Sequence, residues 1–150
     1  MQTLKIFQSF KKIKDLGIPV LGICLGMQLL MDKSFEFGEN KGLGLISGEV
    51  VPVPSVGNKQ RIIVPYVGWS KIDFRKSLLT KNLNQKKGFY FTHSFMSVPK
   101  NNNHIIATYK HFTNKIVAVI GKNNFYGCQF HPEKSGSDGL FLIKNFINLN

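Results

Sequence analysis

The sequence predicts an α/β domain in which a mostly parallel sheet is flanked by helices, and three observations support this prediction. Helix-like and strand-like patterns alternate at the start of the chain, and a helix-like pattern closes it. The 150 residues fit one domain of ordinary size. A composition that is 43% hydrophobic, with 13 Phe, can fill one large core. We therefore expect residues 1–150 to form a single domain without an internal linker.

Three elements are expected in the first 31 residues. Residues 3–16 carry an apolar side chain at every third position, which predicts a helix that Gly17 can end. Pro19 prevents further helix, and the continuous apolar run 20–23 is typical of a strand buried on both faces. Residues 25–31 then favour a second helix. This order is typical of α/β domains with a parallel sheet.

The remainder of the chain is expected to be rich in strands and to end in a helix. Glycines and prolines separate the strand candidates, which are residues 49–51, 61–64, 69–73, 89–91, 105–109, 116–120 and 125–130. The last two face each other across residues 121–124, which indicates a hairpin. Residues 137–148 have an amphipathic helical pattern, with Leu140, Ile143, Phe146 and Ile147 on one face.

The formal net charge of +12 is a feature of some nucleic-acid binders. Arginine is the side chain that binds phosphates and guanines in bidentate fashion, yet only Arg61 and Arg75 are present among the 20 basic residues. The lysines are scattered along the chain, and the densest group, in residues 10–14, alternates with apolar residues as on the solvated face of a helix. We expect no nucleic-acid partner, and a basic binding module remains only a third hypothesis.

The two cysteines, Cys24 and Cys128, cannot form a framework of disulfides. Lys5, Lys11 and Lys12 interrupt any apolar signal segment, and no apolar run has the length of a membrane span. The sequence therefore favours a cytoplasmic protein with free thiols and no membrane contact.

The pentapeptide Gly22-Ile23-Cys24-Leu25-Gly26 follows the first predicted strand and has the form of a nucleophile elbow with Cys in place of Ser. Its glycines would let the backbone turn sharply and expose the thiol. The N-terminus of the following helix is expected to lower the thiol pKa, and the Leu25 N–H could donate to an oxyanion. Taken alone, the pentapeptide could also hold a buried cysteine between packing glycines.

A second motif supplies the other groups that a thiol nucleophile needs. Gln129-Phe130-His131-Pro132-Glu133 follows a predicted strand, and residues i and i+2 of an extended backbone share one side. Glu133 could therefore orient His131 as the base for Cys24, which predicts a catalytic triad in the order Cys, His, Glu. A histidine satisfied at a strand end is the alternative for His131.

The two motifs, taken together, resemble the signatures of class I (triad) glutamine amidotransferases. The matching segments are Gly22-Ile23-Cys24-Leu25-Gly26-Met27-Gln28 and Gln129-Phe130-His131-Pro132-Glu133-Lys134-Ser135-Gly136. Further segments resemble the glutaminase subunits of imidazole glycerol phosphate synthase, namely residues 42–48, 67–69, 90–95 and 139–146. The resemblance implies a flavodoxin-like fold and no cofactor or metal.

The resemblance also implies a reaction and a substrate site. Cys24 would attack the side-chain amide of glutamine, His131 would protonate the departing ammonia, and water would hydrolyse the thioester to glutamate. Gly26 and Gln28 would help to bind the glutamine. The segment His93-Ser94-Phe95 would support the same substrate, largely through its backbone, although a core strand with a polar bend is an equal alternative.

The partner implied by the resemblance is a cyclase subunit of histidine biosynthesis, a (βα)8 barrel that receives the ammonia in a heterodimer. Pro65, Tyr66, Gly68 and Trp69 match the part of the family that meets this partner. The family pattern is Pro-His-Met-Gly-Trp-Asn, whereas this chain has Pro65-Tyr66-Val67-Gly68-Trp69-Ser70. The departure leaves two alternatives open, a glutaminase that feeds a sugar amidotransferase of surface-polysaccharide biosynthesis and a non-catalytic docking module.

Members of the family have a strand–helix–strand stretch before the helix that opens this chain, with a glycine-rich loop that gives a second oxyanion donor. We therefore expect the domain to be incomplete at its N-terminus, with an exposed sheet edge. Cys128 is expected to be a buried strand residue, and His104 and His111 to be exposed in loops. A zinc site of Cys24, His93 and His131 lacks metal-ligand spacing and is not expected.

Overall fold

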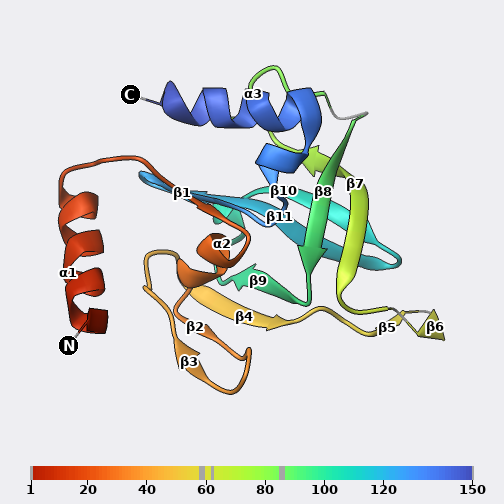
Figure 1. Ribbon diagram of the computed structural model, residues 1–150, viewed down its shortest axis with the longest axis horizontal. Coiled ribbons are helices and arrows are strands. Elements are labelled where there is room, and N and C mark those ends of the chain that lie inside the picture. Colours follow the sequence, from red (N-terminus) through yellow and green to blue (C-terminus); the bar gives the residue numbers. More distant parts are fainter. Residues whose placement is uncertain (1, 58–59, 62, 85–86, 150) are drawn as a thin grey trace.

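The computed structural model describes residues 2–57, 60–61, 63–84 and 87–149 and shows two sheets with helices packed against them (Figure 1). Three α-helices are present in these residues, namely α1 (Gln2–Asp15), α2 (Leu25–Leu29) and α3 (Gly136–Ile147). The short 3₁₀ helices are η1 (Asn102–His104) and η2 (Pro132–Lys134). The helices predicted over 3–16 and 137–148 are confirmed to within one residue at each end, and α2 ends two residues earlier than expected.

The larger sheet has six strands in the order β1-β12-β11-β10-β7-β8. Their bounds are β1 (Val20–Ile23), β7 (Tyr66–Phe74), β8 (Gly88–His93), β10 (Ile105–His111), β11 (Asn114–Lys122) and β12 (Phe125–Cys128). Among the described residues of this sheet, β1 and β12 pair in parallel and the other neighbours are antiparallel. The α/β class is confirmed, but the expectation of a mostly parallel sheet is wrong. Short hairpins such as the one between β11 and β12 can join only antiparallel strands.

A second sheet has the order β3-β2-β4-β9. Its strands are β2 (Lys33–Ser34), β3 (Asn40–Lys41), β4 (Gly48–Pro52) and β9 (Phe95–Pro99), and a small ribbon is made by β5 (Val56–Gly57) and β6 (Gln60–Arg61). One residue, Ser94, separates β8 from β9, so the chain passes there from one sheet to the other. Of the strand predicted over 61–64, residue 61 lies in β6, residue 62 lies outside the described residues, and 63–64 are not in a strand.

Two hydrophobic clusters fill the interior. One joins the six-stranded sheet to α3, and its aromatic centre includes Phe89 and Phe130, with ring centroids 4.4 Å apart. The other lies where α2 and the second sheet meet β11 and β12. Its buried members are Met27, Leu30, Met31, Ile46, Val50, Val117, Ile120 and Phe125. Both ends of β12 are therefore held by packing, which fixes the position of the residues that follow it.

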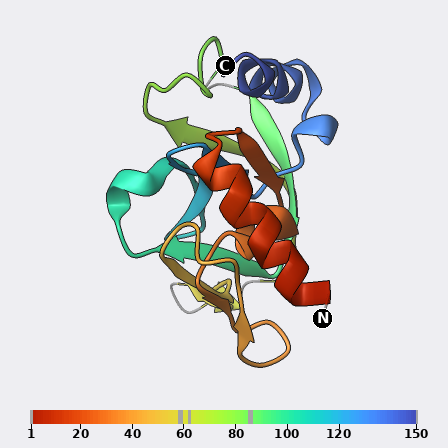
Figure 2. The same ribbon diagram turned by 90° about the vertical axis from the view of Figure 1, so that its left-hand side faces the viewer.

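Strand β1 is less buried than the sequence predicts, because it is an edge strand of the six-stranded sheet. Val20, Leu21 and Ile23 are only half-buried, and the prediction of burial on both faces is wrong for them. Helix α1 lies beside the edge of the sheet in Figure 1 and crosses that edge in Figure 2, and its Phe10 and Ile13 pack against the second cluster. No helix among the described residues combines the length and apolar content needed to span a bilayer.

Candidate active site

The parallel pairing of β1 with β12 brings the two sequence motifs together. The strands are in register, with Ile23 opposite Cys128, and the Cys24 N–H donates to the Cys128 carbonyl at 2.8 Å. Parallel neighbours end at the same edge of a sheet. Cys24 and the segment that contains His131 therefore leave the sheet side by side, although they are more than 100 residues apart.

Cys24 lies at a sharp turn between β1 and α2, with φ 50° and ψ −107°. A positive φ is unfavourable for a residue with a side chain and is often found at functional sites. The expectation that Gly22 and Gly26 allow the sharp turn through their backbone freedom is wrong, because neither has a positive φ. A Cβ at Gly22 would lie 2.4 Å from the Gly26 carbonyl oxygen, so Gly22 is required for close packing. A Cβ at Gly26 would meet no atom within 4 Å.

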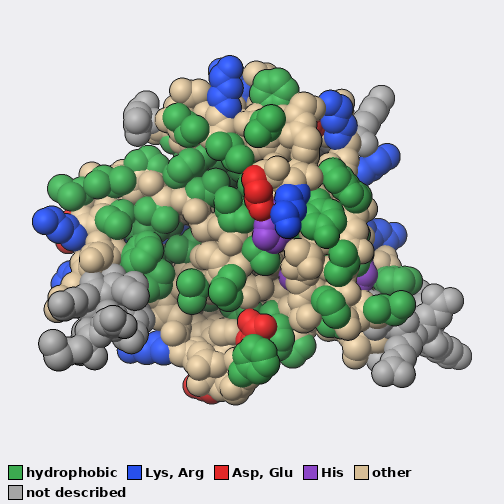
Figure 3. Space-filling view, in the orientation of Figure 1, with side chains coloured by type: hydrophobic (Ala, Val, Ile, Leu, Met, Phe, Trp, Pro, Cys, Tyr) green, Lys and Arg blue, Asp and Glu red, His purple; other side chains and the backbone are tan. Residues whose placement is uncertain are grey.

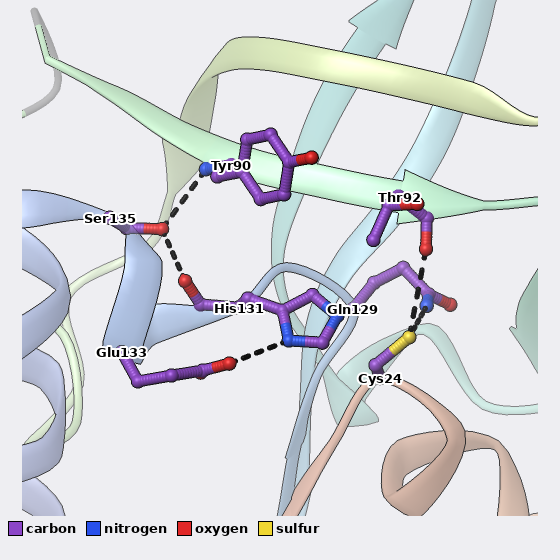
Figure 4. Close-up of polar contacts among 7 residues, drawn as sticks. All are labelled: Cys24, Tyr90, Thr92, Gln129, His131, Glu133 and Ser135. Carbon is purple, nitrogen blue, oxygen red and sulfur yellow. Dashed lines mark hydrogen bonds and ion pairs between the residues drawn. The ribbon is translucent and has the colours of Figure 1, made fainter.

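The Cys24 thiol is half-buried and hydrogen-bonded on two sides (Figure 4). It donates to the backbone carbonyl of Thr92 at 3.8 Å and accepts from Nε2 of Gln129 at 3.6 Å. Burial raises the pKa of the thiol, and the hydrogen bonds from the Leu25 N–H and from Gln129 oppose this rise. The expected net lowering of the pKa is therefore wrong, because α2 is short and desolvation is the larger effect.

His131 and Glu133 form the contact that the sequence predicts, since Nδ1 lies 2.7 Å from Oε1 of the carboxylate. The expected extended backbone is wrong, because residues 132–134 form the 3₁₀ turn η2. Desolvation acts to raise the pKa of Glu133, but the hydrogen bond to His131 and the nearby positive charges lower it overall. Figure 4 shows the ring of His131 between Glu133 and Cys24. No hydrogen bond links this ring to the Cys24 sulfur among the described residues.

The backbone of His131 is attached to β8 by a closed set of hydrogen bonds. The His131 N–H donates to the Tyr90 carbonyl at 2.9 Å. The buried Ser135 hydroxyl donates to the His131 carbonyl at 2.6 Å and accepts from the Tyr90 N–H at 3.0 Å. These bonds fix the position of the imidazole relative to β8. Tyr90 and Ser135 both lie in segments that resemble the family, but the sequence alone predicts no role for either.

The residues proposed to bind glutamine lie around Cys24, but two of their side chains are buried. Gln28 is 7% exposed, and its Nε2 donates to the Phe95 carbonyl at 3.1 Å and to Oε1 of Gln129 at 3.2 Å. His93 is 5% exposed and hydrogen-bonds Tyr109, so only its backbone could meet a substrate. Burial lowers the pKa of His93 to about 4, which keeps the imidazole neutral. Gly26 lies on α2, and Ser94 and Phe95 lie at the passage from β8 to β9.

The residues proposed as a partner interface divide between two faces of β7. Trp69 and Val67 point outward, with exposed fractions of 59% and 56%. Pro65 is also exposed. The Tyr66 ring points inward and packs against His111, with 4.5 Å between the ring centroids. The expectation that this side chain belongs to the outer surface is therefore wrong. Gly68 lies between them with φ 158°, a value that few other residues adopt.

Three other expectations can be compared with the structure. Cys128 is fully buried, as predicted, and burial raises its pKa far above the ordinary value. His111 is also buried, at 6% exposed, and His104 is half-buried, so the prediction that both are exposed is wrong. His111 ends strand β10 rather than lying in a loop. Across the described residues, no three His, Cys, Asp or Glu side chains are grouped to hold a metal ion.

Comparisons with known proteins give consistent results. Residues 4–149 match the family model described as glutamine amidotransferase class-I. Imidazole glycerol phosphate synthase subunit HisH 1 of Legionella pneumophila (strain Lens) is 43% identical, over 99% of this chain and 73% of the relative. The subunit HisH of Lactococcus lactis subsp. lactis (strain IL1403) is 41% identical, over 98% of this chain and 72% of the relative. This chain thus spans about three quarters of the length of these relatives.

A solved structure from Thermoplasma acidophilum, described as a GMP synthase protein, has the same fold. It superposes with a TM-score of 0.64 at 22% identity, over 96% of this chain and 63% of that chain. A second solved structure, described as a glutamine amidotransferase, superposes with a TM-score of 0.58 at 14% identity, over 94% of this chain and 68% of that chain. Both similarities concern the fold, and they confirm the fold class predicted from the sequence.

The two glycines of the elbow should respond differently to substitution by alanine. Gly22→Ala places a Cβ 2.4 Å from the Gly26 carbonyl oxygen, so it should lower the free energy of unfolding by about 1–3 kcal/mol. Gly26→Ala adds a methyl group to an open space on α2 and should leave stability unchanged or raise it slightly. Urea unfolding followed by circular dichroism measures both effects. Equal stability of the two variants would contradict the packing role of Gly22.

His93 should make the stability of the protein depend on pH. In the unfolded chain it binds a proton below pH 6.5, whereas in the folded protein it does so only below about pH 4. Between these values the unfolded state binds more protons, so stability should fall as the pH falls, by about 3 kcal/mol in total. His93→Phe should flatten this dependence, and His104→Phe, which removes a smaller lowering of the pKa in the same direction, should preserve most of it. Urea unfolding of the three proteins at pH 7.0, 5.5 and 4.5 tests this, and an unaltered slope in His93→Phe would exclude His93 as its source.

Proposed function

The chain belongs to the class-I glutamine amidotransferase family, and on this basis we propose that it hydrolyses glutamine at Cys24 and delivers the ammonia to a synthase partner. The observation that carries the proposal is the 2.7 Å contact between His131 and Glu133 beside the elbow that bears Cys24. A thiol, an imidazole and a carboxylate at one sheet edge form the set of groups that acyl transfer to a thiol requires. Family membership identifies glutamine as the acyl donor.

In the proposed reaction, the Cys24 thiol first gives its proton to the ring nitrogen of His131 that does not face Glu133. The sulfur then attacks the side-chain carbonyl carbon of glutamine, and the Leu25 N–H donates to the oxyanion that forms. His131 returns the proton to the leaving nitrogen, and ammonia departs. Water, activated by His131, then attacks the thioester, and the C–S bond breaks to give glutamate and the free thiol.

Glu133 would have a stabilising part in this cycle. Its carboxylate accepts from Nδ1 and fixes which ring nitrogen faces the thiol. The lowered pKa of Glu133 keeps the carboxylate ionised at neutral pH, so it can stabilise the imidazolium when His131 carries the proton. The carboxylate itself does not exchange protons with the substrate.

The relatives named above suggest where the ammonia goes. Because they are subunits of imidazole glycerol phosphate synthase, we infer that the acceptor site lies in a cyclase subunit of that enzyme, in histidine biosynthesis. The departure at Tyr66 does not argue against this partner, since the Tyr66 ring packs inward on His111 and its hydroxyl lies 2.7 Å from the Ser70 hydroxyl. The change at Tyr66 therefore alters the interior beneath the surface, whereas the change at Val67, which is 56% exposed, alters the surface itself.

The docking surface proposed for this partner lies on the outer face of β7 and β8, next to the catalytic histidine. Trp69 meets Tyr90 edge to face, with ring centroids 5.9 Å apart, and the Lys134 ammonium lies 5.8 Å from the Tyr90 ring centroid. An exposed Trp beside a Tyr is typical of the centre of a protein interface. On the face shown in Figure 3, hydrophobic side chains surround a histidine that has an acidic and a basic neighbour.

The proposed nucleophile can be tested by covalent labelling. A glutamine analogue with an electrophile in place of the amide should modify Cys24, which is half-buried, and spare Cys128, which is fully buried. Peptide mass mapping identifies the labelled residue, and Cys24→Ala should abolish both the labelling and the release of glutamate. Labelling of Cys128 would refute the assignment of the nucleophile.

The roles of the other two triad residues predict unequal losses of activity. His131→Ala should lower turnover by about 10²–10⁴-fold, because the imidazole transfers protons in both half-reactions. Glu133→Gln should lower turnover at least tenfold but less than His131→Ala, since an amide can still hold the ring but cannot stabilise its charge. Glutamate release is measured in the presence of the synthase partner. Wild-type turnover in Glu133→Gln would exclude the proposed orienting role.

The docking surface can be separated from the chemistry with one matched pair of variants. Trp69→Ala should weaken binding of the cyclase partner at least tenfold, as expected for a central aromatic side chain, and should leave labelling of Cys24 by the analogue unchanged. Leu140→Ala, on α3, removes a side chain of similar exposure, 61% against 59%, and should bind the partner normally. Calorimetric titration measures the binding. Equal affinities of the two variants would place the interface elsewhere.

A further inference from the structure

Gln129 is a fully buried residue of the second motif that has no part in the triad. It follows β12 and lies two residues before His131, and its N–H donates to the Ala118 carbonyl at 2.8 Å. Both ends of its side-chain amide are engaged. Oε1 accepts from Gln28 at 3.2 Å, and Nε2 donates to the Cys24 sulfur at 3.6 Å. A buried amide with partners on both sides can hold a neighbouring group in one place.

The orientation of this amide follows from its neighbours. The Phe95 carbonyl can only accept, so the atom of Gln28 that faces it at 3.1 Å must be the NH₂ group. The second hydrogen of that group then points to Gln129, which must present its oxygen to Gln28 and its own NH₂ group to the sulfur. The neutral His93 ring supports the same carbonyl, since its Nδ1 lies 2.8 Å from the Phe95 oxygen. A donor therefore faces Cys24.

Besides the Leu25 N–H, the sulfur has two hydrogen-bond partners, the Thr92 carbonyl and the Gln129 amide, and these have opposite preferences for its charge. The Thr92 carbonyl accepts the S–H hydrogen, so it stabilises the protonated thiol and repels a thiolate. The Gln129 NH₂ group can donate to either form and stabilises the thiolate more strongly. When the proton passes from sulfur to His131, the contact with Thr92 is lost and the contact with Gln129 becomes stronger.

We propose that Gln129 is a positioning residue that stabilises the Cys24 thiolate once its proton has passed to His131, and directs the sulfur away from the Thr92 carbonyl. This inference rests on the proposed role of Cys24 as the nucleophile, and it assigns to the buried side chains of Gln129 and Gln28 a role in setting the reactivity of that nucleophile. Gln129 acts through Cys24 and does not contact the substrate in this scheme.

The test is the rate at which iodoacetamide alkylates Cys24 between pH 6 and pH 10, followed by peptide mass mapping of the whole chain. Gln129→Met retains the bulk of the side chain and removes the donor, whereas Gln129→Glu retains the oxygen that accepts from Gln28 and places a negative charge near the sulfur. Both variants should alkylate at least tenfold more slowly than the wild type at pH 7, because a hydrogen bond to a charged group is lost. Their rate profiles should move to higher pH. Gln8→Met, at an exposed position on α1, is the matched control and should behave as the wild type.

Cys128 provides an internal control for folding, since this adjacent thiol is fully buried and should be alkylated only if the fold opens. Slow alkylation of Cys24 with Cys128 unlabelled, in either variant, would support the inference. Profiles that coincide with the wild type would overturn it. Labelling of Cys128 in both variants would also overturn it, because Gln129 would then maintain the fold rather than the sulfur. Alkylation needs no glutamine, so a failure of the proposed function would appear separately, as absent glutamate release by the wild type with its partner.

Discussion

The in-register parallel pairing of β1 with β12 is the constraint on which the site depends. It is the only parallel contact in the described part of the six-stranded sheet, and it joins a segment near the start of the chain to one near its end. The hydrogen bond from the Cys24 N–H to the Cys128 carbonyl extends the pairing by one residue past β1. A shift of the register by one residue would turn every side chain to the other face and separate the nucleophile from Gln129 and His131. The close contact of Gly22 with the Gly26 carbonyl then fixes where the turn occurs.

Burial gives this site its resting state. The thiol is desolvated and lies against a carbonyl oxygen, and both conditions favour its protonated form. Two donors, the Leu25 N–H and the Gln129 amide, act in the opposite direction. The carboxylates of Glu133 and Glu36 also raise the thiol pKa. Glu133, which orients the base, therefore disfavours the thiolate until the imidazole of His131 is charged. In this arrangement, transfer of the proton to His131 creates an ion pair, and the charge on the ring offsets the field of Glu133.

The elements near the site could be predicted from the sequence because their signals are local. An apolar run followed by a glycine-flanked Cys predicts strand and elbow, and the spacing of His131 and Glu133 predicts their contact. Other features depend on the assembled fold. The sheet is mainly antiparallel because hairpins join its central strands, which a pattern of apolar runs does not specify. The thiol pKa depends on desolvation by distant segments, and the burial of His111 depends on the ring of Tyr66 packed against it. No role for Gln129 follows from its place in the second motif, because its partners Gln28 and Cys24 are 101 and 105 residues away.

Strand β8 is the element through which docking could act on the chemistry. Its Thr92 carbonyl accepts from the Cys24 thiol, and its Tyr90 backbone holds both His131 and Ser135. The same strand pairs with β7, where Tyr90 lies opposite Trp69 and Thr92 lies opposite Val67. A partner bound on Trp69 and Val67 would therefore contact two residues of β7 whose neighbours on β8 hold the site in place. The neighbour of Trp69 holds the base, and the neighbour of Val67 holds the nucleophile. A small displacement of β8 would move the Thr92 carbonyl relative to the sulfur, and it would weaken the one contact that specifically favours the protonated thiol. A dependence of turnover on docking would then require no separate mobile loop, because the strand beneath the interface already carries the atom that restrains Cys24.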